Sequence, residues 1–152
     1  MKLKGWGPFI ITATGSAGAP LFAGVFRPFA SVPPAQANLT AAKLAQLNQQ
    51  HRQQGRILGW ADAYGAPGDV RYVALWLPDP TGGAWSCEGL DDGSAALQAR
   101  FNALTSAWVR PAHVAMTPGP GYLTMFQDDR LDPWSAWGDL TAAKFQEKLA
   151  SP

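Results

Sequence analysis

Arg71-Tyr-Val-Ala-Leu-Trp76 is the stretch that decides the fold, because it occurs three times in outline. Leu21–Phe26 lies 50 residues before it, and Gly121–Gln127 begins 50 residues after it. Aromatic residues occupy the same two places in each copy: Phe22, Tyr72 and Tyr122 in one, and Phe26, Trp76 and Phe126 in the other. Repetition at a fixed period is the sequence signature of a repeat architecture. The sequence therefore predicts a short tandem array.

Each copy is predicted to be the returning strand of a β-hairpin. The outgoing strands are predicted at 8–14, 56–64 and 109–116, and the returning strands at 21–26, 70–76 and 122–127. The first of these is rich in β-branched residues, and Gly/Pro turns join each pair. The Pro-rich segment 29–37 is predicted to be an irregular connection.

The helices are predicted between the hairpins and at the end of the chain. Residues 39–54 suit a helix with Thr40 as N-cap and Gly55 as its end, with one face formed by Leu44, Leu47 and His51. A second helix carries the stripe Leu97, Phe101, Leu104 and Trp108. Thr141-Ala-Ala-Lys144 repeats Thr40-Ala-Ala-Lys43 and opens the last helix.

These elements predict an α+β fold made of three β-hairpin–helix repeats of about 50 residues each. The repeats are expected at about 1–38, 39–89 and 90–138, with a partial closing helix at 139–152. One such unit cannot bury both a hairpin face and a helix stripe, so neighbouring units share burial. We expect one curved antiparallel sheet, an open or half barrel, with helices packed on one face. A β-trefoil has a similar period, but the helical stripe argues against an all-β fold.

The composition excludes several function classes. Charged residues make up 15% of the 152 residues and the formal net charge is +1, so nothing indicates a nucleic-acid partner. Since no run of about 18 apolar residues occurs, we expect no membrane span. Gly5, Gly7 and Pro8 break the apolar start, which makes it a poor signal peptide and favours a cytoplasmic location by default.

The arrangement of residues around the middle copy resembles a known family of repeats. Gly89-Leu90 and Asp139-Leu140-Thr141 open helices, the 56–64 strand ends in Tyr64-Gly65, and Trp85 follows Arg71–Trp76. In these features the chain resembles the bacterial tandem repeat domain found beside β-lactamase-type serine hydrolases, including the polyglycine hydrolases. The resemblance implies an accessory, non-catalytic region, in a family that is often exported, and it supplies no catalytic residues.

No nucleophile motif of the hydrolase partner occurs in this chain. Ser-x-x-Lys is absent, and Thr40-x-x-Lys43 with its repeat at Thr141 is explained by helix capping. The only two histidines, His51 and His113, have no carboxylate at helical spacing, so we expect no metal site and no cofactor. Cys87 is the single cysteine, and its pairing with His113 as nucleophile and base is a minor alternative.

Residues that depart from the repeat are the candidates for a binding site, because the scaffold does not require them. Trp60, Asp62 and Tyr64 alternate along one strand and share a face, which suits an aromatic platform for a sugar ring or a peptide. The alternative for the aromatic residues is core packing, and for Asp62, Asp69 and Arg71 a solvated cross-strand ion pair. The predicted binding residues are Trp60, Asp62, Tyr64, Arg71 and His113.

Three functions remain open at this point. The first is a non-catalytic binding module that presents an aromatic-rich concave sheet to a protein, peptide or glycan. The second is a small enzyme or pocket protein in which His113, Asp62 or Tyr64 performs acid–base chemistry. The third is a homo-oligomer subunit that associates through the open end of the array.

Overall fold

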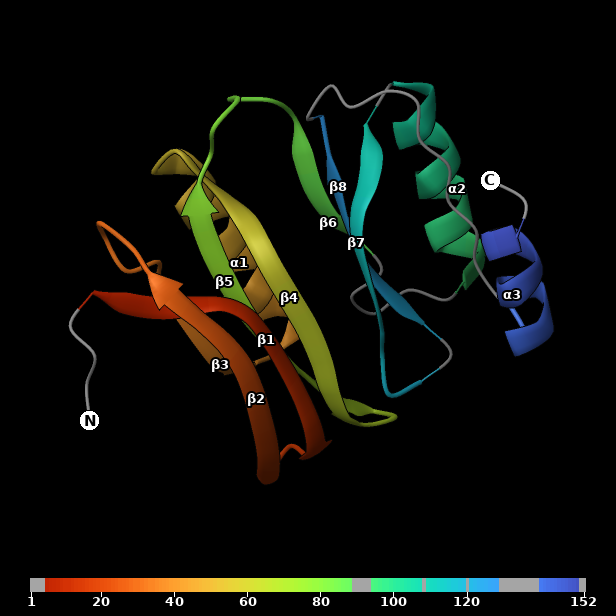
Figure 1. Ribbon diagram of the computed structural model, residues 1–152, viewed down its shortest axis with the longest axis horizontal. Coiled ribbons are helices and arrows are strands. Elements are labelled where there is room, and N and C mark those ends of the chain that lie inside the picture. Colours follow the sequence, from red (N-terminus) through yellow and green to blue (C-terminus); the bar gives the residue numbers. More distant parts are fainter. Residues whose placement is uncertain (1–4, 89–93, 108, 120, 129–139, 151–152) are drawn as a thin grey trace.

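The computed structural model describes residues 5–88, 94–107, 109–119, 121–128 and 140–150. In this part of the chain the fold is α+β, as predicted, with three helices and eight strands in three antiparallel sheets (Figure 1). None of these helices is both long enough and apolar enough to cross a bilayer.

The second sheet is the most complete part of the fold. It contains β3 (Ala35–Leu39), β4 (Arg56–Ala66) and β5 (Asp69–Pro78) in the order β3-β5-β4. Helix α1 (Ala41–Gln53) connects β3 to β4 and begins as predicted, because the Thr40 hydroxyl accepts the Lys43 amide at 3.2 Å.

Helix α1 covers one face of the second sheet, as Figure 1 shows. The predicted helix face is confirmed, since Leu44 and Leu47 are buried in the core and the His51 ring stacks on Trp76 at 4.4 Å. The strand residues of this core share the face toward α1 and include Leu58, Ala61, Ala63, Tyr72, Ala74 and Trp76. Apolar burial of this kind contributes about 25 cal/mol for each Å² removed from water.

The third sheet repeats the arrangement of the second. It contains β6 (Trp85–Glu88), β7 (Arg110–Met116) and β8 (Tyr122–Gln127) in the order β6-β8-β7. Helix α2 (Ser94–Ser106) lies against β8, where the Phe101 and Phe126 rings meet edge to face at 5.9 Å. The last helix is α3 (Ala142–Ala150). It lies near α2, at the end of the molecule that is farther from the second sheet (Figure 1).

The first sheet is a single hairpin of β1 (Trp6–Ser16) and β2 (Ala19–Pro28). It lies against the face of the second sheet that α1 does not cover (Figure 1). Its turn repeats the next hairpin's: Gly15 and Gly65 both have positive φ, 89° and 107°. A Cβ at either glycine would collide with a carbonyl oxygen four residues on, so the turn requires glycine.

Two features of the prediction differ from the structure. The single curved sheet is not confirmed, because the strands of the described residues form three separate hydrogen-bonded sheets that do not close into a barrel. The irregular connection predicted at 29–37 is wrong in its last residues, because these belong to strand β3, which pairs with β5. Strand β6, which pairs with β8, was also not predicted. Both strands are short, and neither alternates clearly between apolar and polar residues. Trp108, a member of the predicted stripe, lies outside the described residues.

Candidate functional site

Three of the five predicted binding residues lie together between the sheets. Trp60 and Asp62 are side chains of β4, and His113 of β7 contacts Trp60. The Trp60 and His113 rings stack with centroids 4.0 Å apart. We call these three residues the junction cluster.

The junction cluster ties the first hairpin to the second sheet. The Asp62 carboxylate accepts hydrogen bonds from the Thr12 hydroxyl at 2.7 Å and from the Ala13 amide at 3.0 Å. The Trp60 indole N–H donates to the Ile11 carbonyl at 2.8 Å. Side chains of β4 thus bond to the backbone of β1, where a continuous sheet would use a backbone ladder.

His113 ties the third sheet to the second in the same manner. Its Nε2 lies 2.8 Å from the Ala61 carbonyl oxygen. A carbonyl oxygen only accepts, so Nε2 carries the proton and donates it. This contact orients the His113 ring through Nε2.

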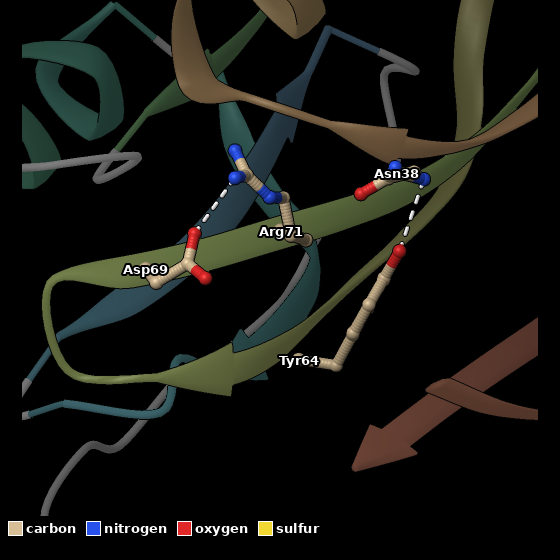
Figure 2. A network of polar contacts seen from close by, with 4 residues as sticks. All are labelled: Asn38, Tyr64, Asp69 and Arg71. Atoms are coloured by element: carbon tan, nitrogen blue, oxygen red, sulfur yellow. Dashed lines mark hydrogen bonds and ion pairs between the residues drawn. The ribbon is translucent and has the colours of Figure 1, made fainter. Parts of the chain in front are cut away.

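Tyr64 on β4 and Arg71 on β5 have other partners than the junction cluster, which Figure 2 shows. Tyr64 is only 2% exposed, and its hydroxyl accepts the Asn38 amide at 3.0 Å. Asn38 has a positive φ of 58° and sits in the irregular part of the β3–β5 ladder, so Tyr64 satisfies an amide that the ladder leaves unpaired. Arg71 pairs with Asp69 at 2.8 Å along the same strand, at the beginning of β5.

The chemistry of these residues is that of inter-sheet contacts. Asp62 accepts three hydrogen bonds, the third from the Ala63 amide at 2.9 Å. Tyr64 is buried under the first hairpin, where the Phe22 ring meets it edge to face at 5.5 Å. Trp60 and Tyr64 therefore form no open platform, and the aromatic side chains predicted for ligand stacking contact the protein itself.

Cys87 and His113 do not form a nucleophile–base pair in this fold. Both are paired with Met125 of β8, Cys87 from one side and His113 from the other. Two strands that flank a third lie about 9–10 Å apart, beyond hydrogen-bond distance. Among the residues that the structure describes, no three His, Cys, Asp or Glu side chains gather as metal ligands would.

A groove outside the junction cluster has a partly polar lining. A groove of about 420 Å³ between α1 and β6 is lined by Ala45, Asn48, Gln49, Arg52, Trp85, Ser86, Cys87 and Arg100. Its Arg52 guanidinium stacks over the Trp85 ring at 4.3 Å and also donates to the Trp85 carbonyl, so this cation is used internally.

The pKa of His51 is shifted by its surroundings. Burial beside Trp76 lowers the pKa below its usual value near 6.5, and the charge of Arg56 lowers it further. A side-chain hydrogen bond with Gln54 opposes both effects. His51 is therefore held in its neutral form by the core of the second sheet.

The sequence did not reveal a group of exposed apolar side chains on the first hairpin and the segment after it. We call it the hairpin surface, and its members are Trp6, Leu21, Phe22, Val25, Phe26 and Val32. Large apolar patches on a folded surface mark sites of interaction.

Comparison with known proteins identifies the middle of the chain. No curated protein matches the chain. Residues 34–78 match the family model described as polyglycine hydrolase-like, structural repeat. The matched residues span β3, α1, β4 and β5, which is the complete second sheet with its helix. The resemblance predicted from the sequence is thereby confirmed, because these residues match the polyglycine hydrolase-like structural repeat.

Proposed function

We propose that the chain is a non-catalytic accessory module of a polyglycine hydrolase-like protein and that it binds a polypeptide through the hairpin surface. The repeat match at residues 34–78 supports the accessory role, because it concerns a structural repeat. The observation that carries the binding role is the set of exposed apolar side chains on β1, β2 and the following segment.

The contacts of the candidate catalytic groups support the non-catalytic role. Asp62, Tyr64 and His113 each bond to backbone groups of this chain. A general acid or base must instead reach a proton of the substrate. The second function considered from the sequence, acid–base chemistry by these three residues, gains no support from this geometry.

The character of the hairpin surface favours a polypeptide over a glycan. Leu21, Val25 and Val32 are exposed aliphatic residues, and Phe22 and Phe26 are exposed aromatic residues. Aliphatic and aromatic groups together suit the apolar side chains of a protein partner, whereas sugars stack on aromatic faces with polar groups at the rim.

The accessory role is tested by labelling the purified chain with a fluorophosphonate, which marks nucleophilic serines, and by assaying ester and polyglycine hydrolysis. We expect no labelling and no turnover above buffer. Labelling of any serine, or turnover that an Asp62→Asn or His113→Gln change abolishes, would overturn the proposal.

The binding role is tested with a fluorescent apolar probe, anilinonaphthalene sulfonate. We expect the folded chain to enhance its emission and the change Phe26→Gln to reduce that emission several-fold. Val114→Gln is the matched control, because Val114 is an exposed apolar residue on β7, outside the hairpin surface. Equal emission from the two variants would show that the hairpin surface does not bind apolar groups.

A further inference from the structure

Phe26 occupies a position that is covered in the other two sheets. Its counterparts Trp76 and Phe126 are 1% and 0% exposed, whereas Phe26 is 56% exposed. In the second sheet α1 supplies the cover, where His51 stacks on Trp76 and Asn48 accepts the indole N–H at 2.9 Å. In the third sheet Phe101 of α2 covers Phe126. The face of β2 around Phe26 therefore has the form of a helix-binding face without its helix.

Helix α3 has the complementary form, a helix of the α1 type whose apolar side chains are exposed. Thr141 caps it as Thr40 caps α1, accepting the Lys144 amide at 3.3 Å. The next residue, Phe145, corresponds to Leu44, which is fully buried on the second sheet. Phe145 is 50% exposed and Leu149, one turn later on the same side, is 64% exposed.

The two surfaces cannot meet within one molecule in this arrangement. Figure 1 shows the β1–β2 hairpin and α3 at opposite ends of the molecule, with the second and third sheets between them. They are, however, free to meet between two molecules.

We propose that α3 of one copy packs on β2 of a second copy, with Phe145 and Leu149 against Phe22 and Phe26. The contact continues an interface that the molecule already uses twice, α1 on β5 and α2 on β8. This inference rests on the proposed binding role of the hairpin surface, and it names the partner as a second copy of the chain.

The contact is heterologous, because the two partners contribute different surfaces. The pair then keeps one unused hairpin surface, on one copy, and one unused α3, on the other, so association proceeds head to tail and gives chains or a closed ring. A nine-residue helix on one hairpin buries less than the roughly 1,200 Å² of a standard interface, so we expect weak, concentration-dependent association.

The test uses two variants that each lose one partner surface. Phe26→Asp damages the hairpin surface and leaves α3 intact, and Phe145→Asp does the opposite. Both side chains are half exposed or more, so circular dichroism should show unchanged folding. Val114→Asp is the control for an added charge on an exposed apolar site.

Sedimentation velocity between roughly 10 µM and 1 mM, the range of weak interfaces, measures the outcome. We expect the weight-average mass of the unaltered chain and of Val114→Asp to rise with concentration, and each damaged variant alone to stay at one chain. An equimolar mixture of the two damaged variants should form dimers and nothing larger, since one intact pair of surfaces remains.

Three results would overturn the proposal. The unaltered chain stays at the mass of one chain throughout, which would leave the hairpin surface to a different partner. Association survives either single change. The mixture fails to form dimers although the unaltered chain associates, which would indicate an interface elsewhere. None of these results bears on the fluorophosphonate and hydrolysis assays, so failure of the non-catalytic role is recognised separately.

Discussion

The β1–β2 and β4–β5 hairpins are built on the same register and have opposite environments. Their aromatic residues align at 22 and 72 and at 26 and 76. In both hairpins the strand register shifts directly after the third residue pair, between Pro8 and Ile10 in one and between Leu58 and Trp60 in the other. Nevertheless Tyr72 and Trp76 are buried, whereas Phe22 and Phe26 are exposed. The difference teaches that the repeated motif does not specify burial. Burial of the returning strand is supplied by the strand and helix that precede each hairpin, β3 with α1 and β6 with α2.

The largest expected effect in this comparison comes from removing the covered aromatic ring. Trp76→Ala should lower the free energy of unfolding by about 3–5 kcal/mol, because it leaves a cavity between α1 and β5 and frees Asn48 from its hydrogen bond. The matched change Phe26→Ala should cost under about 1 kcal/mol, since the ring is mostly in water.

Urea unfolding followed by circular dichroism measures both, at a concentration where the chain is monomeric. Trp76→Phe serves as a graded variant if Trp76→Ala does not fold. Similar costs at 26 and 76 would break the comparison.

The second expected effect concerns how the two hairpins are joined. Asp62→Ala should cost about 1–3 kcal/mol, because it removes the acceptor of the Ala13 and Ala63 amides and of the Thr12 hydroxyl. Hydrogen exchange should show faster exchange in β1 and β2 with little change in α1 and β5. Asp62→Asn keeps one acceptor oxygen and should cost less. A uniform increase in exchange would mean that the first hairpin does not open separately.

Local signals were sufficient to predict most of the fold. The Thr40 cap, the Leu44–Leu47 face and the glycine turns depend on neighbours within a few residues, and the structure has each of them. The short strands β3 and β6 could not be predicted, because they exist only through pairing with β5 and β8 far along the chain. The division into three sheets could not be predicted either, because it also depends on which strands pair far along the chain.

The candidate site was predicted only in part. Departures from the repeat drew attention to Trp60, Asp62 and His113, and in the structure each of these side chains joins its strand to another sheet. Their partners are backbone groups of other sheets, which no pattern in the sequence reveals. The exposed hairpin surface was not predicted, since Phe22 and Phe26 align with the buried Tyr72 and Trp76 and the aligned positions alone do not distinguish them.

A smaller effect on the free energy of unfolding is expected from pH. It concerns only the β4–β5 hairpin, because His51 of α1 stacks on Trp76 of β5. Its pKa is lowered in the folded protein, so the unfolded chain binds the proton more readily. The free energy of unfolding should therefore fall as pH drops below about 6.5, the unfolded value, and level off below the folded pKa. His51→Phe keeps a ring on Trp76 without a titrating group and should lose this dependence.

Urea unfolding at intervals between pH 7.5 and pH 5 measures the difference, under the two-state treatment. His113 and the carboxylates are common to both proteins and cancel in the comparison. The interpretation is wrong if the two profiles run parallel, because His51 would then contribute nothing to the stability of the cover over β5.

The smallest effect is expected at Arg71, which the first hairpin replaces with Leu21 at the same position. The Arg71–Asp69 pair is 2.8 Å long, but its side chains are 28% and 55% exposed. Exposed pairs contribute under about 1 kcal/mol, since water and salt screen them. Arg71→Ala should therefore change the unfolding midpoint slightly, and 1 M NaCl should remove the difference. A cost above about 2 kcal/mol that salt does not reduce would show that the β4–β5 turn depends on Arg71 for packing, and that the two hairpins differ in their turns as well as in their cover.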